Sequence, residues 1–169
     1  MTTRMALSKD LDAVVHILNQ SILRGNENGR LATVKASELH DWFFEHSPSR
    51  YPLLVTEEQG EVVGWLSLGA YRPGREALRR TAEISYYVRQ RKKRQGIGST
   101  LMKEALRICP CLGIKVLVAF LLEHNSGSIA LLRKFGFERW GLFPQAAYIG
   151  GKLVGQLCYG KLLEKADRV

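Results

Sequence analysis

The residues best suited to chemistry lie in and after a cationic loop. Five of the six residues 89–94 are Arg or Lys, and Gly96 and Gly98 follow directly. An amphipathic pattern over residues 99–108 predicts a helix after the glycines. Glycines let the backbone approach a ligand closely, and the unpaired N–H groups of a first helical turn attract anions. The segment therefore predicts a phosphate-binding turn.

A candidate catalytic base lies upstream of this turn. The apolar run at residues 82–88 predicts a strand that leads into the cationic loop, and Glu83 stands near its start. A carboxylate there could take a proton from a nucleophile bound beside the phosphate site. The alternative is a surface carboxylate at a strand start, without a chemical role.

The charge balance favours an anionic partner. Lys and Arg number 25 against 16 Asp and Glu, which gives a net charge of +9. The cations directly precede a Gly-x-Gly helix start, which suits a compact polyphosphate better than nucleic acid. A solvated basic loop and a basic nucleic-acid-binding module remain the alternatives.

Length and composition predict one domain over residues 1–169, because 169 residues with 46% hydrophobic content can form a single core. No apolar run reaches the length of a membrane span, and residues 1–7 do not resemble a signal peptide. We therefore expect a cytoplasmic protein without membrane contact.

The cysteines predict neither disulfides nor a metal site. They number three, and Cys109 and Cys111 have neither zinc-pair nor redox spacing. We expect ordinary reduced thiols and no bound metal.

Periodicity and turn signals predict a mixed α/β fold in which one mixed sheet carries helices on both faces. Ser8 is the expected N-cap of the first helix, and Gly136 is placed to end the last one. The expected order is β-α-α-β-β-β-α-β-α-β-β, with strands at 3–7, 51–56, 62–68, 82–88, 115–122, 137–142 and 153–162 and helices from 8, at 35–46, 99–108 and 125–135.

Three motifs follow one another along the chain. Lys93-Arg-Gln-Gly-Ile-Gly98 forms the cationic glycine turn, a strand and a helix flank it, and residues 125–137 predict a helix that ends in Gly-Phe. Together they give the chain a resemblance to the GCN5-related N-acetyltransferase (GNAT) superfamily over essentially its whole length. Residues 64–68, 71–72, 81–88, 124–125 and 128–131 resemble the phosphinothricin acetyltransferase group, with its methionine sulfone and sulfoximine relatives.

The resemblance implies acetyl-CoA as cosubstrate and no metal. The glycine turn would bind the pyrophosphate, and the strand ahead of it would bind the pantetheine arm through its backbone and polarise the thioester. The implied cofactor-binding residues are Tyr86, Tyr87, Val88, Lys93, Arg94, Gln95, Gly96, Ile97, Gly98, Ser99, Asn125, Ser128 and Lys134, with Arg133 as a weaker candidate.

The same resemblance implies acetyl transfer to the primary amine of an amino acid or analogue, by direct attack in a ternary complex. Glu83 would be the base, and Arg72 and Arg75 would bind an anionic group of the acceptor. A protein N-terminus or lysine is the alternative acceptor, and a CoA-binding protein without catalysis is a further alternative. The group's habit of dimerising implies a homodimer.

Three positions and one longer segment depart from the family pattern. Lys93 replaces Gln or Arg, and Arg94 stands where glycine is common. Leu132 occupies the position of a tyrosine that protonates the leaving thiolate in many members. The first region expected to line the acceptor site, residues 25–33, lacks the Thr-rich, Phe-containing stretch of the amino-acid-sulfone group.

Overall fold

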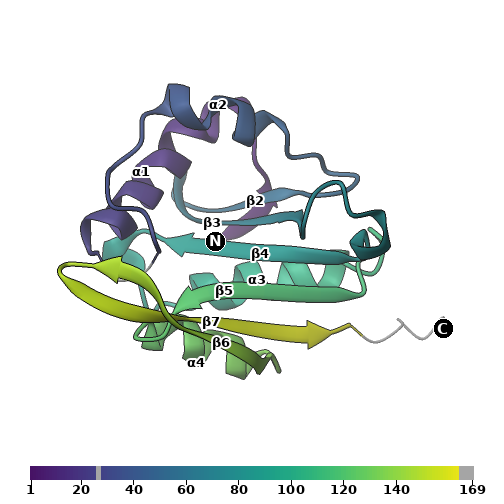
Figure 1. Ribbon diagram of the computed structural model, residues 1–169. Coiled ribbons are helices and arrows are strands. Elements are labelled where there is room, and N and C mark those ends of the chain that lie inside the picture. The colour runs from purple at the N-terminus through teal and green to yellow at the C-terminus, as the bar shows by residue number, and fades with distance from the viewer. Residues whose placement is uncertain (26–27, 164–169) are drawn as a thin grey trace.

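The computed structural model describes residues 1–25 and 28–163 and contains a seven-stranded mixed sheet (Figure 1). The strands lie in the order β1-β2-β3-β4-β5-β7-β6; β4 and β5 pair in parallel, and the other neighbours pair antiparallel. The elements are β1 (Thr2–Met5), α1 (Leu11–Leu23), α2 (Ala36–Phe44), β2 (Leu53–Glu58), β3 (Glu61–Ala70), β4 (Thr81–Val88), α3 (Ile97–Ile108), β5 (Val116–Leu122), α4 (Ser126–Lys134), β6 (Glu138–Ile149) and β7 (Lys152–Leu162), with short 3-10 turns at Ser8–Asp10, Glu76–Leu78 and Gln90–Lys92. The predicted fold class and element order are confirmed.

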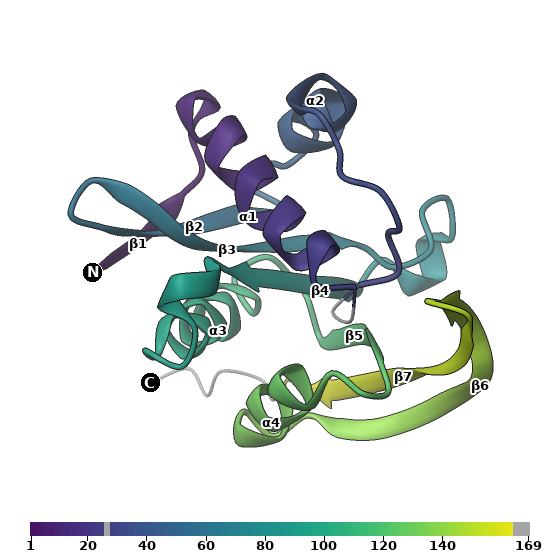
Figure 2. The same ribbon diagram turned by 90° about the vertical axis from the view of Figure 1, so that its left-hand side faces the viewer.

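Two apolar cores lie on opposite faces of the sheet, as the predicted helices on both faces require. Helices α1 and α2 pack on one face, where Trp65 is 2% exposed, and α3 and α4 pack on the other, where Leu66 is fully buried. Neighbouring residues of β3 reach opposite cores because side chains alternate along a strand. Figure 2 shows α1 above the sheet and α3 and α4 below it. None of the described helices is long and apolar enough to cross a membrane.

The β2–β3 hairpin turns more tightly than expected. The turn signal covered residues 57–60, but Glu58 still pairs with Glu61, so Gln59 and Gly60 alone form the loop. Both have positive φ, 52° and 80°, which matches the two-residue turn that suits twisted strands. The turn expected at residues 24–29 includes residues 26 and 27, which lie outside the described residues.

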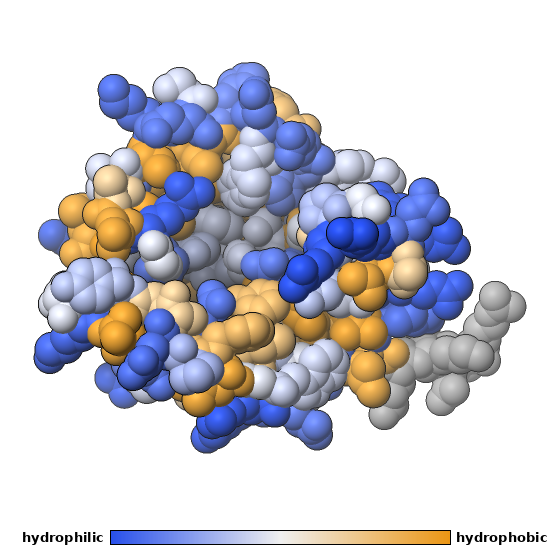
Figure 3. All heavy atoms as spheres, in the orientation of Figure 1, coloured by the Kyte–Doolittle hydropathy of each residue, from blue (hydrophilic) through white to orange (hydrophobic). Residues whose placement is uncertain are grey.

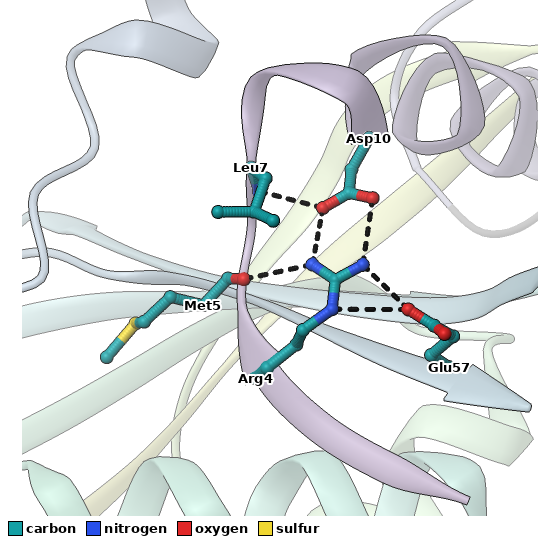
Figure 4. A network of polar contacts seen from close by, with 5 residues as sticks. All are labelled: Arg4, Met5, Leu7, Asp10 and Glu57. Atoms are coloured by element: carbon teal, nitrogen blue, oxygen red, sulfur yellow. Dashed lines mark hydrogen bonds and ion pairs between the residues drawn. The ribbon is translucent and has the colours of Figure 1, made fainter. Parts of the chain in front are cut away.

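The predicted N-cap at Ser8 is wrong. Ser8 lies inside the 3-10 turn, and the Asp10 carboxylate caps it by accepting a hydrogen bond from the Leu7 N–H at 2.7 Å. Arg4 donates to Asp10 at 2.6 and 3.1 Å and also binds Glu57 of β2 (Figure 4). This network joins the edge strand β1, the turn before α1 and the neighbouring strand β2.

Asp10→Asn is expected to lower the free energy of unfolding by about 1–3 kcal/mol at neutral pH, because Asp10 is 3% exposed and would lose its charged bonds to Arg4. Burial alone would raise the pKa of Asp10, but the hydrogen bonds from Arg4 and Leu7 keep this pKa below its usual value. The contribution is therefore present above the unfolded pKa and lost as pH falls through the lowered folded pKa. Urea unfolding at pH 7 and pH 3 measures it. A difference between variant and wild type that does not shrink at acid pH would contradict this explanation.

Strand β6 is longer than the predicted 137–142. It passes Pro144 and continues to Ile149, with an irregular register against β7 between Phe143 and Ala147 and a positive φ of 53° at Gln145. A proline inside a strand is tolerated at a sheet edge, and β6 is an edge strand. At the end of α4, by contrast, Gly136 has φ +73° and ends the helix as expected.

Candidate active site

A gap opens between β4 and β5 at the centre of the sheet. Thr81–Glu83 of β4 pair with Val116–Val118 of β5. Beyond these residues both strands continue, but they form no further pair with each other. A small cavity of about 60 Å³ occupies the opening. It is lined from both strands and from α4 by Ile84, Ser85, Tyr86, Tyr87, Ala119, Phe120, Leu121, Asn125, Ser128 and Leu132. The sheet is therefore split at the place where a slender ligand could replace the missing pairs.

The backbone of β4 offers hydrogen-bonding groups to this gap. The Arg89 N–H donates to Val63 of β3 and the Thr81 carbonyl accepts from Tyr71, so odd-numbered residues face β3. Because these groups alternate along a strand, those of Tyr86 and Val88 face the gap. The expectation that Tyr87 binds a ligand through its backbone is thereby corrected, since its backbone groups face β3.

The start of α3 presents N–H groups without helical partners. Thr100 is the first residue whose N–H bonds back within this segment, to the Gly96 carbonyl at 2.9 Å, so Ile97, Gly98 and Ser99 precede the helical ladder. Gly96 has φ +86°, and Arg94, at the position where glycine is common, has φ +64°. Left-handed residues before a helix turn successive N–H groups toward one point, which makes a concave anion site.

A cavity of about 960 Å³ joins this helix start to the gap. It brings together 12 of the 13 predicted cofactor-binding residues: Tyr86, Tyr87, Val88, Lys93, Arg94, Gly96, Ile97, Gly98, Ser99, Asn125, Ser128 and Lys134. The exception is Gln95, whose side chain is exposed and donates to the Arg91 carbonyl at 3.2 Å. Arg133 is exposed and does not line the cavity either.

Sequence reasoning missed a second wall of the cavity. Arg24, at the end of α1, lines it together with Gln90, and the two side chains are joined by a 2.6 Å hydrogen bond. His124 and Gly127 contribute from the start of α4. Arg24 lies 66 residues from Gln90, so no local pattern signals that they meet.

Asn125 and Lys134 have roles inside the protein as well as positions at the cavity. Asn125 caps α4 by accepting a hydrogen bond from the Ser128 N–H at 3.1 Å, and Lys134 donates to Ser99 across the cavity at 3.2 Å. The Tyr86 hydroxyl donates to the Ser128 carbonyl at 3.4 Å, and Leu132 is fully buried one helical turn farther on. These contacts fix the start of α4 beside β4 and join the end of α4 to the start of α3.

Glu83 lies where the split begins. It belongs to the last β4–β5 pair, with Val118, and because side chains alternate along β4 it points to the face opposite Tyr86. Its side chain is half-buried, and desolvation raises the pKa of its carboxyl. A carboxyl held in this way suits proton transfer nearer neutral pH. Glu83 lines neither the large nor the small cavity, so it lies beside the gap on its other face.

The predicted acceptor-binding arginines are exposed and stand apart from the cavity. Arg72 and Arg75 lie in the loop after β3, where the Arg75 N–H donates to the Arg72 carbonyl at 3.2 Å. The Arg72 guanidinium lies 5.8 Å from the ring centre of Tyr71. The loop thus holds Arg72 near the Glu83 face of the sheet, because Tyr71 continues β3 on that face.

The acetyltransferase (GNAT) family model matches residues 16–137, which is well over half of the chain. The chain belongs to this family. A Bacillus subtilis protein provisionally named a phosphinothricin acetyltransferase is 43% identical, over 90% of this chain and 93% of its own length. A Pseudomonas paraeruginosa L-methionine sulfoximine/L-methionine sulfone acetyltransferase is 32% identical, over 85% of this chain and 83% of its own. The structure of a phosphinothricin acetyltransferase from Sinorhizobium meliloti in complex with acetyl-CoA has a TM-score of 0.90 and 28% identity, and covers 98% of this chain and 90% of its own.

The protein is accordingly an acetyl-CoA-dependent N-acetyltransferase. The residues present fit this cosubstrate: a cationic helix start suits a pyrophosphate, and the split between β4 and β5 suits an extended pantetheine arm.

Proposed function

We propose that the protein acetylates the primary amine of a free amino acid or a close analogue, of the phosphinothricin, methionine sulfone or methionine sulfoximine type. The observation that carries this proposal is the half-buried carboxylate of Glu83, beside the mouth of the gap and on the opposite face from α3 and α4. The relatives named for such acceptors, at 32–43% identity, support the same acceptor class.

In the proposed mechanism the two substrates meet across the gap. Glu83 takes a proton from the acceptor ammonium, and the neutral nitrogen attacks the thioester carbonyl carbon. An N–H of Tyr86 or Val88 stabilises the negative charge on the carbonyl oxygen. The carbon–sulfur bond then breaks and CoA leaves as a thiolate. The nitrogen, positively charged after the attack, releases its second proton to solvent, which leaves a neutral amide.

No covalent acyl-enzyme is needed, and the cysteines support this order of events. Burial raises the pKa of the Cys109 thiol to about 12, and it raises the pKa of Cys158 as well, so neither is activated as a thiolate. Leu132 supplies no proton, but a thiol is acidic enough to leave as the anion and take a proton from solvent.

The basic loop does not favour the nucleic-acid alternative. The basic loop that prompted the nucleic-acid alternative faces the cosubstrate cavity through Lys92, Lys93 and Arg94, and Lys92 is paired with Glu58. Three of the five cations of the loop therefore lie where a polyphosphate would bind, and Arg89 pairs with Glu61.

Thiol release from acetyl-CoA over a panel of amines tests the proposal. The panel contains phosphinothricin, methionine sulfone, common amino acids, polyamines and a lysine peptide. We expect turnover on one or a few amino acids or analogues at the highest kcat/KM. A preference for the peptide would contradict the proposed acceptor class, and acetyl-CoA binding without turnover on any amine would indicate a catalytically silent protein.

We further propose that a single domain comprises residues 1–169, and that it forms a homodimer in the cytoplasm. Cys109, Cys111 and Cys158 are free thiols, which suits a reducing compartment. Phe143 and Tyr148 expose about half or more of their side chains, 51% and 66%, along the edge strand β6, where a second subunit could cover them. Light scattering on the purified protein would give the mass of the assembly, and a monomer at micromolar concentration would contradict the dimer.

A further inference from the structure

Free space lies directly beside Glu83. Gly69 of β3 is its cross-strand partner, and partners of this kind carry their side chains on the same face of a sheet. A Cβ placed on Gly69 would meet no atom within 4 Å, although the preceding residue, Leu68, is fully buried. Figure 3 shows a hollow at the centre of the face seen in Figure 1, below α1 and α2.

An aromatic pair borders this space. Tyr71 follows β3 and Phe120 belongs to β5, and their rings stack with centres 6.3 Å apart and planes 14° apart. Because β3 and β5 flank β4, the rings meet over the face of β4 that carries Glu83. Phe143 of β6 continues the apolar border, with its ring centre 6.5 Å from that of Phe120.

Cys158 closes the border on the β7 side. It pairs across the strands with Phe120, and the negative charge of Glu83 contributes, after burial, to the raised pKa of its thiol. The Cys158 thiol therefore lies near the Glu83 carboxylate and stays protonated. Phe120 also lines the small cavity between β4 and β5, so the space connects with the gap where the acetyl group would arrive.

The charges at the two ends of this space have opposite signs. Glu83 lies at its floor, and Arg72 lies over Tyr71 at its rim. Between them, aromatic rings and a neutral thiol offer dispersion contacts but no counter-charge. A zwitterionic α-amino acid with an uncharged side chain matches this distribution.

We propose that the space over Gly69, bordered by Tyr71, Phe120 and Cys158, binds the side chain of the acceptor and selects slender, uncharged ones. The acceptor ammonium lies at Glu83 and its carboxylate at Arg72. This subsite rests on the proposed function and goes beyond it, because it assigns acceptor selection to residues of β3, β5 and β7.

Gly69→Val tests the subsite, because it fills the space without touching the cosubstrate cavity. Gly69 does not have positive φ, so a side chain there causes no backbone strain. With methionine sulfone as acceptor, we expect its KM to rise about tenfold or more while the KM for acetyl-CoA stays unchanged. Ala70→Val is the matched control, because it adds bulk one residue farther along β3 on the opposite face of the sheet.

Phe120→Leu provides a second variant in case Gly69→Val folds poorly. It keeps an apolar side chain but removes the ring that stacks on Tyr71. We expect the ratio of kcat/KM for methionine sulfone to that for alanine to change by about tenfold. Because Phe120 also lines the gap, the ratio is the readout: a change in acetyl-CoA binding would affect both acceptors alike.

The outcomes separate this inference from the proposed function. Wild-type turnover on amino acids with an unchanged acceptor KM in Gly69→Val, or an equal loss in Ala70→Val, would overturn the subsite and leave the proposed function intact. A wild-type enzyme that acetylates no amino acid would overturn both.

Discussion

Replacing Glu83 by Gln is expected to lower kcat by about 100-fold or more, while acetyl-CoA binds as tightly as to the wild type. Glutamine keeps the shape of the side chain but cannot accept the proton that the acceptor ammonium must lose. Glu83 lies beside the gap and outside the cosubstrate cavity, so binding of acetyl-CoA should not change. Steady-state kinetics and calorimetry measure the two quantities separately.

The pH profile gives this prediction a second readout. Desolvation raises the pKa of Glu83, so the base becomes protonated at a higher pH than an ordinary glutamate. Wild-type activity should therefore fall as pH decreases through this raised pKa, and Glu83→Gln should lack that acid limb.

The raised pKa of Glu83 also affects stability, in the direction opposite to its effect on activity: the fold gains stability at low pH, where activity falls. A carboxyl whose folded pKa exceeds its unfolded value favours the fold at low pH, and this contribution is lost as pH rises through the folded pKa. The charged Glu83 thus destabilises the protein at neutral pH, and Glu83→Gln should unfold at a higher temperature than the wild type at pH 7. The difference should vanish at acid pH, where both side chains are neutral.

Glu104→Gln is the matched control for these measurements. Glu104 lies on α3 and pairs with Arg107 at 2.7 Å, outside the cavity and away from the Glu83 face. It should leave kcat unchanged. A Glu83→Gln enzyme with wild-type turnover and an intact acid limb would show that another group, or solvent, accepts the proton.

Gly96→Val is expected to weaken acetyl-CoA binding by about tenfold or more, which corresponds to about 1.4 kcal/mol. Gly96 has φ +86° at the N-cap of α3, a conformation that a β-branched residue adopts only under strain. Relief of that strain would turn the N–H groups of Ile97 and Gly98 away from the pyrophosphate. Calorimetry with acetyl-CoA measures the loss.

Gly113→Val separates this loss from general destabilisation. Gly113 has φ +73° and open space around it, as Gly96 does, but it lies in the turn between α3 and β5 and does not line the cavity. Both variants should lose about 1–3 kcal/mol of folding free energy, and only Gly96→Val should lose affinity. Equal losses of affinity would mean that strain acts through the whole fold rather than at the anion site.

Local signals in the sequence were sufficient to predict the helices and strands and the cosubstrate side of the candidate site. Periodicity predicts the strands and helices because it reflects which side of each element is buried. The phosphate-binding turn could be predicted because its glycines, cations and helix start lie within 11 residues, 89–99, so that sequence spacing alone brings them together. Two residues show the limit of local signals. The left-handed conformation of Arg94 is not evident from its residue type. The turn before α1 is capped by Asp10 rather than Ser8, and Arg4, which lies outside the turn, binds the Asp10 carboxylate.

Local sequence patterns were enough to predict the fold class, the proposed cosubstrate site at the start of α3 and a candidate base. How these parts face one another follows from tertiary contacts. The gap exists because the parallel pairing of β4 and β5 ends after Glu83 and Val118, and the wall from Arg24 and the space beside Gly69 arise from contacts between distant segments. Hydrophobic periodicity records whether a residue is buried, not what it is buried against, so the acceptor side of the site appears only once the strands are paired.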